Sequence, residues 1–371
     1  MAAGLVFHGS RVRAATATPN PCIVTARVHS FRIGDRKPAR RLFATSPQDP
    51  DPSPVTSPTR QETDFGQPGS GLTTTRSPQI ESAHERDEFY IRQPYEVYSE
   101  ENHTTWTRLY ARMEDRWAEF ANRHFLAGIE RLHFDQSAVP RLEDVNEFLR
   151  PLTGFSAKAV SGYIPAFQFF DCLARREFPT TITVRPGDNL DYLPEPDIFH
   201  DIAGHVPMHT DPAFADTLVR FGTLARRAAA RARKLPDLDD RVRQLSSVVK
   251  ALSRFFWFSI EFGLMDDGNG TKAYGSGLLS SYGELEHSLR SPEVQRYPFQ
   301  LEWVVNQAFE VDSYQPLLFV IESFDQLFEL VGELDDWMVE GRLDNVAQGE
   351  PDVGTADIRS FLSAPEEVVI A

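Results

Sequence analysis

The sequence is organised around the hexapeptide His200-Asp-Ile-Ala-Gly-His205, which follows Leu193-Pro-Glu-Pro-Asp-Ile-Phe199. Two prolines hold the approach extended, Asp197 is a favourable N-cap residue, and Pro207 cannot continue a helix. The two histidines are therefore expected on a short helix with defined ends. Two imidazoles and one carboxylate, brought together by the fold, form the ligand set of a non-haem Fe(II) site with open coordination positions.

The five-residue spacing of His200 and His205 needs a physical explanation. On a regular α-helix five residues rotate a side chain by roughly 140°, too far for both rings to reach one metal ion, whereas the four-residue step of zinc peptidases keeps both rings on one face. A local widening of the helix, for which Gly204 offers the freedom, or a position of His200 at the very start of the helix would bring the rings together. The sequence predicts one of these two arrangements. A hydrogen-bonded pair of core histidines without a metal is the alternative.

The third candidate ligand is Glu261, in the segment Phe255-Phe-Trp-Phe-Ser-Ile-Glu261-Phe-Gly-Leu-Met265. Nearly every other residue of this segment is apolar, so the carboxylate lies where a lone negative charge is costly to bury. A metal ion, an arginine or a lysine would each compensate this charge. The alternative is a surface glutamate on an amphipathic helix.

Four blocks of the sequence resemble the pterin-dependent aromatic amino acid hydroxylases, and within this family the bacterial phenylalanine 4-monooxygenases. The blocks are PEPDIFHDIAGHVP (194–207), WFSIEFGL (257–264), KAYGSGLLSSYGEL (272–285) and YQPLLFVIESF (314–324). They follow one another in the family's order, and the resemblance covers about residues 85 to 340.

The resemblance implies a mainly α-helical fold with a few short strands, which is the catalytic-domain fold of that family. It implies that His200, His205 and Glu261 bind Fe(II), and that tetrahydrobiopterin or a related tetrahydropterin supplies electrons for the reaction with O2. The expected activity is hydroxylation of the ring of a free aromatic amino acid, in the first place phenylalanine to tyrosine. Tryptophan and tyrosine hydroxylases of the same family are the alternatives.

The resemblance also assigns residues to the amino acid substrate. Arg185, read alone, is a solvated arginine at the end of a strand, but the family uses the matching guanidinium to hold the α-carboxylate by paired hydrogen bonds. By resemblance, Ser280 lies near that carboxylate and Trp257 lies beside the aromatic ring. Val311 falls where the phenylalanine enzymes carry an apolar residue and the animal tyrosine enzymes an acidic one, which favours phenylalanine.

A further set of residues is assigned to the pterin. The resemblance implies that Ile164, Ala166 and Phe169 touch the cofactor, with Phe169 stacked on its bicyclic ring. Asp201, beside the first histidine, is expected near the pterin rather than on the metal. Read from the residues alone, this aromatic stretch is ordinary core.

The composition describes an acidic protein with a formal net charge of −16 and a pI near 5.1. Nucleic acids and anionic membranes both attract positive patches, so neither is an expected partner. No apolar run reaches the roughly eighteen residues needed to span a bilayer. The only two cysteines, Cys22 and Cys172, form no disulfide framework and fit a reducing compartment. The expected location is the cytoplasm.

The chain is expected to divide into an N-terminal extension (1–81), a catalytic domain (82–345) and an acidic tail (346–371). Residues 1–46 carry eight Arg or Lys and a single acid, which is typical of an organellar transit peptide; an unstructured tail, or a start codon assigned too far upstream, is the preferred interpretation. Residues 47–81 are rich in Pro, Ser, Thr and Gly and cannot build a core. The tail shows no sustained heptads, so a monomer is expected.

Hydrophobic periodicity and β-branched runs predict the regular elements. Helices are expected at about 106–121, 125–132, 142–152, 212–234, 238–262 and 324–340, and strands at 180–184 and 317–321.

Two other classes of protein fit parts of the pattern. A zinc hydrolase uses a similar ligand set and a metal-activated water. The residue after His200 is Asp, however, and the spacing is five, so the peptidase motif with its general-base glutamate is absent. A catalytically idle binding protein that senses amino acids is the second alternative.

Overall fold

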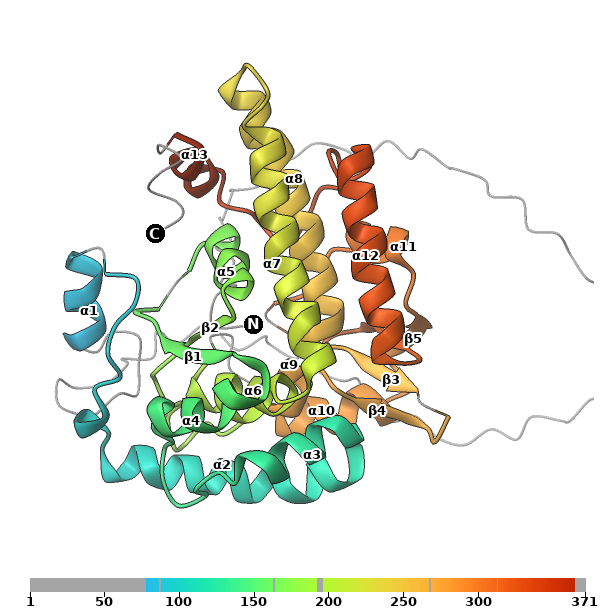
Figure 1. The fold of residues 1–371 in the computed structure, drawn as a ribbon. Coiled ribbons are helices and arrows are strands. Elements are labelled where there is room, and N and C mark those ends of the chain that lie inside the picture. Colours follow the sequence, from blue (N-terminus) through green and yellow to red (C-terminus); the bar gives the residue numbers. More distant parts are fainter. Residues whose placement is uncertain are drawn as a thin grey trace, which may run out of the picture. The chain divides into compact units, whose positions relative to one another are not determined.

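The computed structural model describes residues 78–86, 88–162, 164–191, 196–266, 268–311 and 313–363. Helices dominate this part of the chain (Figure 1), which confirms the mainly α-helical fold. In chain order they are α1 (Pro78–Glu85), the 3₁₀-helix η1 (Tyr95–Val97), α2 (Glu100–Phe120), α3 (Arg123–Leu132), α4 (Leu142–Thr153), α5 (Ala166–Ala174), the π-helix η2 (Phe199–His205), α6 (Val206–His209), α7 (Pro212–Ala232), α8 (Leu238–Phe256), the π-helix η3 (Trp257–Glu261), α9 (Ser276–Leu279), α10 (Tyr282–Arg290), α11 (Leu301–Asn306), α12 (Phe324–Glu340) and α13 (Thr355–Ser363). Most of the expected N-terminal extension, through residue 77, lies outside the described residues.

Two small sheets accompany the helices. Strands β1 (Ser156–Ala159) and β2 (Glu177–Thr180) pair in parallel. The second sheet has the order β4-β3-β6-β5 and consists of β3 (Leu264–Asp266), β4 (Thr271–Ala273), β5 (Gln295–Pro298) and β6 (Leu317–Ile321). Strand β4 is antiparallel to β3, whereas β6 is parallel to both β3 and β5. The strand expected at 317–321 is therefore confirmed.

Local sequence signals explain where the long helices begin. Helix α2 follows Ser99, whose hydroxyl accepts the N–H of Asn102 at 3.2 Å, while the Asn102 side chain accepts the N–H of Ser99 at 3.0 Å. This reciprocal capping satisfies two backbone donors that the first helical turn leaves free. Helix α12 begins and ends where the periodicity placed it, and α7 and α8 begin after the aspartate caps Asp211 and Asp237.

The strand expected at 180–184 is wrong, because the strand of this region is β2 and ends at Thr180. The residues after Thr180 form no strand, and their backbone groups bind the histidine segment instead of a neighbouring strand. The N–H of Thr181 donates to Asp201 Oδ2 at 2.7 Å, and the carbonyl of Thr183 accepts the N–H of Ile198 at 2.8 Å. The β-branched alternation thus marks a segment that supports η2 through backbone hydrogen bonds.

The long helices α7, α8 and α12 lie side by side, and α5 packs across α7 (Figure 1). Gly222 makes the α5–α7 crossing close, since a Cβ there would meet the backbone nitrogen of Ala174 at 2.2 Å and the carbonyl of Phe170 at 2.4 Å. Any larger residue at this position would push the two helices apart.

The segment after residue 345, expected to be a tail, contains helix α13, which packs against α8. Ile358 and Leu362 of this helix are buried, and Phe361 lies on Phe167 of α5 with ring centroids 4.0 Å apart. The buried guanidinium of Arg254 on α8 donates to backbone carbonyls between residues 347 and 350. Through residue 363 this segment is part of the folded unit.

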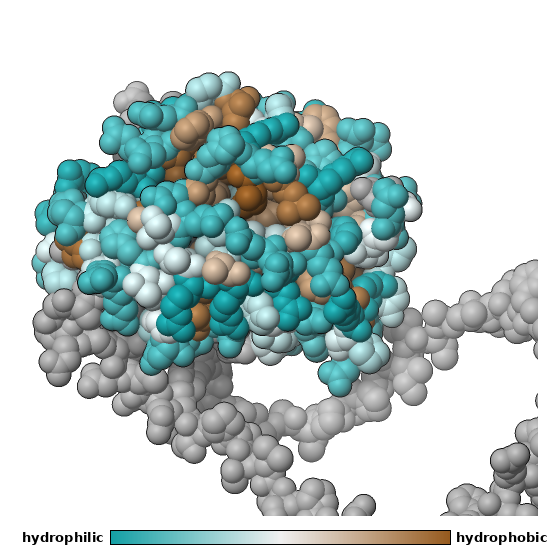
Figure 2. Space-filling view, turned by 90° about the horizontal axis from the view of Figure 1, so that it is seen from below, coloured by the Kyte–Doolittle hydropathy of each residue, from teal (hydrophilic) through white to brown (hydrophobic). Residues whose placement is uncertain are grey.

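Hydrophilic residues cover most of the face seen in Figure 2, and hydrophobic ones gather mainly in its upper half. Within the described ranges, the large hydrophobic side chains that are exposed are Tyr90, Phe148, Leu152, Tyr297 and Val339. No helix in the described part of the chain is both long enough and apolar enough to cross a membrane.

Candidate metal centre

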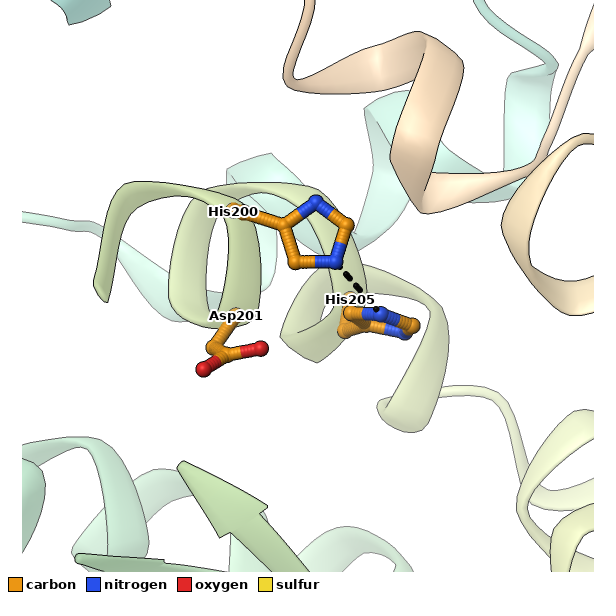
Figure 3. A group of neighbouring side chains, drawn as sticks. All are labelled: His200, Asp201 and His205. Carbon is orange, nitrogen blue, oxygen red and sulfur yellow. Dashed lines mark hydrogen bonds between the residues drawn. The ribbon is translucent and has the colours of Figure 1, made fainter. Parts of the chain in front are cut away.

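Both histidines lie on the π-helix η2, which confirms the predicted widening of the helix. Hydrogen bonds in a π-helix join residues five apart, so side chains with that spacing share one face. The Nε2 atoms of His200 and His205 are 3.2 Å apart, and the two rings are almost perpendicular (Figure 3). Asp197 acts as the expected cap, since its Oδ1 accepts the N–H of His200 at 3.0 Å.

Gly204 contributes close packing to this helix. A Cβ at this position would lie 3.1 Å from the carbonyl of Ser276 and 3.4 Å from the Cβ of Ser280, both on or next to α9. The absence of a side chain lets α9 approach the histidines. A larger residue at this position would require α9 to shift slightly away from η2.

Glu261 converges on the two histidines from a second π-helix, η3. The N–H of Phe262 donates to the carbonyl of Trp257, five residues earlier, at 2.8 Å. Glu261 Oε1 lies 3.2 Å from His205 Nε2, and Oε2 lies 3.5 Å from His200 Nε2. The carboxylate is 1% exposed, so the polarity misfit in the sequence correctly located a buried charge beside compensating groups.

The three side chains have the spacing and chemistry of a metal site. Ligand atoms about 2.1 Å from an ion lie about 3.0 Å apart at an octahedral angle and about 3.4 Å apart at a tetrahedral one. Two of the separations are 3.2 Å and fall in this range, and the third, 3.5 Å between Glu261 Oε2 and His200 Nε2, lies just above it. Among the described residues, Glu261 Oε1 is also a buried oxygen without a hydrogen-bond partner. This donor set fits Fe(II) or Zn(II).

Asp201 is a second carboxylate beside the histidines (Figure 3). Ligand atoms of His200, Asp201 and His205 all lie within 4.8 Å of one another, so this trio is an alternative ligand set. Asp201 Oδ2, however, accepts the N–H of Thr181 at 2.7 Å, whereas the Glu261 oxygens lie 3.2 and 3.5 Å from the Nε2 atoms of His205 and His200. Geometry therefore favours Glu261 as the third ligand and leaves Asp201 next to the centre.

Hydrogen bonds from α9 select the tautomer of His200. Its Nδ1 lies 2.8 Å from Ser280 Oγ, and that hydroxyl donates its single hydrogen to the carbonyl of Ser276 at 2.8 Å. Ser280 Oγ must then accept a hydrogen from Nδ1, which leaves a lone pair on Nε2. Burial holds the pKa of His200 well below its ordinary value, so the ring is neutral. Ser280, expected near the substrate carboxylate, thus has the candidate metal ligand His200 as its partner.

Burial would by itself raise the pKa of Glu261, but attraction to His205 and hydrogen bonding hold that pKa below its usual range. The carboxylate is therefore ionised. The neutral imidazole of His200 and the anionic carboxylate of Glu261 carry the charges that a divalent ion requires of its ligands.

Ser276 also faces the centre, and the sequence did not single it out. Its Oγ lies 2.8 Å from His205 Nε2 and donates to Glu261 Oε2 at 2.9 Å. The available signal was its position four residues before Ser280, since residues four apart share a helical face.

Arg185 forms a buried ion pair with Asp197. Its Nε donates to Oδ2 at 2.8 Å and its Nη2 donates to Oδ1 at 2.9 Å. Nη1 donates to the carbonyls of Leu190 and Asp191. These bonds use four of the five guanidinium N–H groups, and the structure shows no partner for the fifth among the described residues. Arg185 is thus a buried, fixed cation close in sequence to η2.

Trp257, expected beside the substrate ring, is 1% exposed. Its ring stacks on Phe309 at 4.0 Å, and its Nε1–H donates to Gln315 Oε1 at 3.0 Å. The N–H of Gln315 in turn donates to Glu284 Oε1 at 2.8 Å. Burial raises the pKa of Glu284 to about 7. Gln315 and Glu284 were not predicted, although both lie in the quoted blocks.

The same network holds the ends of the loop that carries Val311. Gln315 Nε2 donates to the carbonyl of Glu310 at 2.6 Å and to that of Ser313 at 3.3 Å. Val311 is half-buried and packs against the core. The position of Val311 is therefore coupled to that of Trp257 through one glutamine.

The residues expected at the pterin lie at the start of α5. Ile164 is buried and Ala166 is half-buried. Phe169 is 0% exposed and meets the rings of Phe170, Phe178 and Phe256 at centroid distances of 5.3 to 6.1 Å. Stacking of a cofactor on Phe169 would therefore require one of these neighbours to move.

Comparison with known proteins defines the class to which this fold and site belong. Residues 59–338 match the model of the biopterin-dependent aromatic amino acid hydroxylase family, and the chain belongs to this family. It is 37% identical over 273 residues to the phenylalanine-4-hydroxylase of Caulobacter vibrioides, covering 74% of this chain and 86% of the relative.

Solved structures of phenylalanine hydroxylase from Chromobacterium violaceum share the fold. One, with bound iron(III) and the oxidised cofactor 7,8-dihydrobiopterin, has a TM-score of 0.61 and 37% identity and covers 72% of this chain and 90% of its own. Another structure, with bound iron and phenylalanine, has a TM-score of 0.60 and 35% identity. The match covers 72% of this chain and 91% of the solved chain.

Proposed function

We propose that this protein is a phenylalanine 4-monooxygenase that uses Fe(II), a tetrahydropterin and O2 to hydroxylate free phenylalanine to tyrosine. The observation that carries the proposal is the convergence of His200, His205 and Glu261 within 3.5 Å of one another, in a chain of the biopterin-dependent hydroxylase family. Related structures with iron, dihydrobiopterin or phenylalanine support the choice of cofactors and substrate.

His200, His205 and Glu261 would hold the iron and leave its remaining positions open. Iron and tetrahydropterin together supply the redox chemistry with O2, while the protein binds and orients the reactants. Ser280 keeps the Nε2 lone pair of His200 directed at the centre. The buried surroundings exclude water from the three ligands, which strengthens their electrostatic interaction with a cation.

Arg185 would hold the α-carboxylate of the amino acid. The N–H that has no partner among the described residues can donate to a carboxylate, and the charge of the guanidinium strengthens that bond. The ion pair with Asp197 fixes the orientation of the guanidinium before the substrate arrives. Fixing a binding group in advance lowers the entropic cost of binding.

Trp257 and Val311 would contact the aromatic ring of the substrate. Trp257 is held in place by stacking on Phe309 and by its hydrogen bond to Gln315. The apolar side chain of Val311 offers no hydrogen-bond partner for a ring hydroxyl, which favours phenylalanine over tyrosine.

Ile164, Ala166 and Phe169 would contact the pterin, and Asp201 would lie near it. Because Phe169 is enclosed by other aromatic rings, we expect pterin binding to be accompanied by a rearrangement of side chains at the start of α5. We also propose that the enzyme is cytoplasmic and monomeric. Light scattering of the purified protein would test the oligomeric state, and cell fractionation would test the location.

The test is to incubate the Fe(II)-loaded protein with tetrahydrobiopterin, O2 and, separately, phenylalanine, tyrosine and tryptophan. We expect phenylalanine to gain one oxygen atom, with tyrosine as the product by mass spectrometry and chromatography. Preferential hydroxylation of tyrosine or tryptophan would correct the substrate. Pterin-independent hydrolysis by the zinc-loaded protein, with no hydroxylation by the iron-loaded one, would overturn the proposal.

A further inference from the structure

Ser276 occupies a defined place at the metal centre through tight packing of α9. A Cβ on Gly275 would lie 2.4 Å from the carbonyl of Glu261, and one on Gly277 would lie 3.0 Å from the same oxygen. Gly204 lets α9 approach η2 from the other side. Because α9 is held against both π-helices, the hydroxyl of Ser276 has a fixed position between His205 and Glu261.

The hydroxyl of Ser276 has a single hydrogen to donate and three polar neighbours. They are His205 Nε2 at 2.8 Å, Glu261 Oε2 at 2.9 Å and the carbonyl of Ile260 at 3.3 Å. An anionic carboxylate is a stronger acceptor than a neutral carbonyl. When His205 Nε2 binds a metal ion, its lone pair is no longer available to the hydroxyl. The hydrogen of Ser276 is then directed to Glu261 Oε2.

The two oxygens of Glu261 are therefore not equivalent. Oε2 accepts the Ser276 hydrogen bond, whereas Oε1 is buried and has no hydrogen-bond partner among the described residues. A carboxylate oxygen that accepts a hydrogen bond is a weaker donor to a metal ion than one without such a bond, so the metal is expected on Oε1. Groups that hydrogen-bond to a ligating carboxylate commonly orient it and tune the metal.

We infer that Ser276 is a positioning residue that restricts Glu261 to one-oxygen coordination of the iron, through Oε1. The inference rests on the proposed function, because it concerns the same metal centre. Its consequence is an open coordination position that a two-oxygen carboxylate would otherwise occupy. The residue would act through Glu261 without touching substrate or cofactor.

The inference is tested with Co(II), whose visible absorption reports coordination number because the bands weaken as ligands are added. The variant is Ser276→Ala. The matched control is Ser281→Ala, which also removes a buried hydroxyl but one that has no hydrogen-bond partner in the described structure. Metal affinity is measured in parallel by competition with a chelator.

We expect the cobalt bands of Ser276→Ala to weaken as Oε2 joins the metal, and the Co(II) affinity to change by about 10-fold or more. The Ser281→Ala protein should match the wild type in both measurements. An unchanged spectrum and affinity in a folded Ser276→Ala protein would overturn the inference.

A crystal structure of the cobalt-loaded wild type gives a second test that needs no variant. We expect Glu261 to bind through Oε1 with Ser276 donating to Oε2, and coordination through both oxygens would overturn the inference. Failure of the wild type to bind one Co(II) at this centre would instead contradict the proposed function, so the two failures are distinguishable.

Discussion

Arg185 and Asp197 form a bidentate ion pair in which the same carboxylate also caps the helix that carries His200 and His205. Burial alone would raise the pKa of Asp197, but the charge and hydrogen bonds of Arg185 hold that pKa below its ordinary value. Asp197 thus binds both Arg185, the residue proposed for the substrate carboxylate, and the backbone of His200, the first candidate metal ligand. Changes at Asp197 should therefore affect folding, amino acid binding and metal binding at once.

Asp197→Asn tests this coupling, because the amide keeps an oxygen for the N–H of His200 but loses the charge. We expect the free energy of unfolding to fall by about 3 kcal/mol or more, since a buried arginine is left without its counter-charge. The KM for phenylalanine should rise in the same variant. Denaturant titration and steady-state kinetics measure the two effects.

The control for that experiment is Asp191→Asn, whose carboxylate pairs with Arg112 at 2.9 Å on the surface. An exposed ion pair of this kind contributes less than about 1 kcal/mol to the free energy of unfolding. An equal loss of unfolding free energy in the two variants would show that burial of the Arg185–Asp197 pair does not cause the destabilisation of Asp197→Asn.

Glu261→Ala and Asp201→Asn distinguish the two carboxylates beside the histidines. Removing Glu261 should abolish iron retention, because two imidazoles alone would remain as ligands. Asp201→Asn should retain iron at the wild-type stoichiometry, since an amide can still accept the N–H of Thr181. Iron per chain is measured after desalting, and the opposite pattern would make Asp201 the third ligand.

Glu284→Gln tests the buried carboxyl that holds Gln315. Folding raises the pKa of Glu284 from 4.5 to about 7, so the folded state keeps a proton that the unfolded state releases. The resulting stability is complete below about pH 4.5 and is lost as the pH rises through about 7, a difference of about 3 kcal/mol. Glutamine resembles the protonated form of Glu284 but does not titrate, so its contribution to stability does not change with pH.

We therefore expect wild type and Glu284→Gln to unfold at similar denaturant concentrations near pH 5. Near pH 8 the variant should be the more stable of the two. If the stability difference between wild type and Glu284→Gln were the same at both pH values, Glu284 would be ionised in the folded protein throughout this range.

Trp257→Phe removes the N–H that binds Gln315 while keeping an aromatic ring. We expect a loss of about 1–3 kcal/mol in stability, because a buried amide oxygen is left without its donor, and a raised KM for phenylalanine. Trp303→Phe is the matched control, since Trp303 donates to Gln307 at 2.9 Å outside the centre. A raised KM in the control as well would argue against a specific role for Trp257.

The sequence alone determined the features that depend on local periodicity. The helices α7, α8 and α12 were located from the sequence. The five-residue step between the histidines required either a widened helix or His200 at its very start, and the structure has the first of these, the π-helix η2. Glu261 was recognised because a carboxylate in an apolar run must have a compensating partner. Each of these arguments uses residues within one or two helical turns of one another.

Only the tertiary structure decided which distant groups share a hydrogen bond. The pairing of Arg185 with Asp197, the contact of Ser276 with Glu261 and the support of Trp257 by Gln315 follow from how helices and loops pack. The same holds for the strand expected at 180–184, whose backbone binds η2. Local patterns specify which face of an element is apolar, whereas the partner of a buried polar atom is chosen only when separate elements meet.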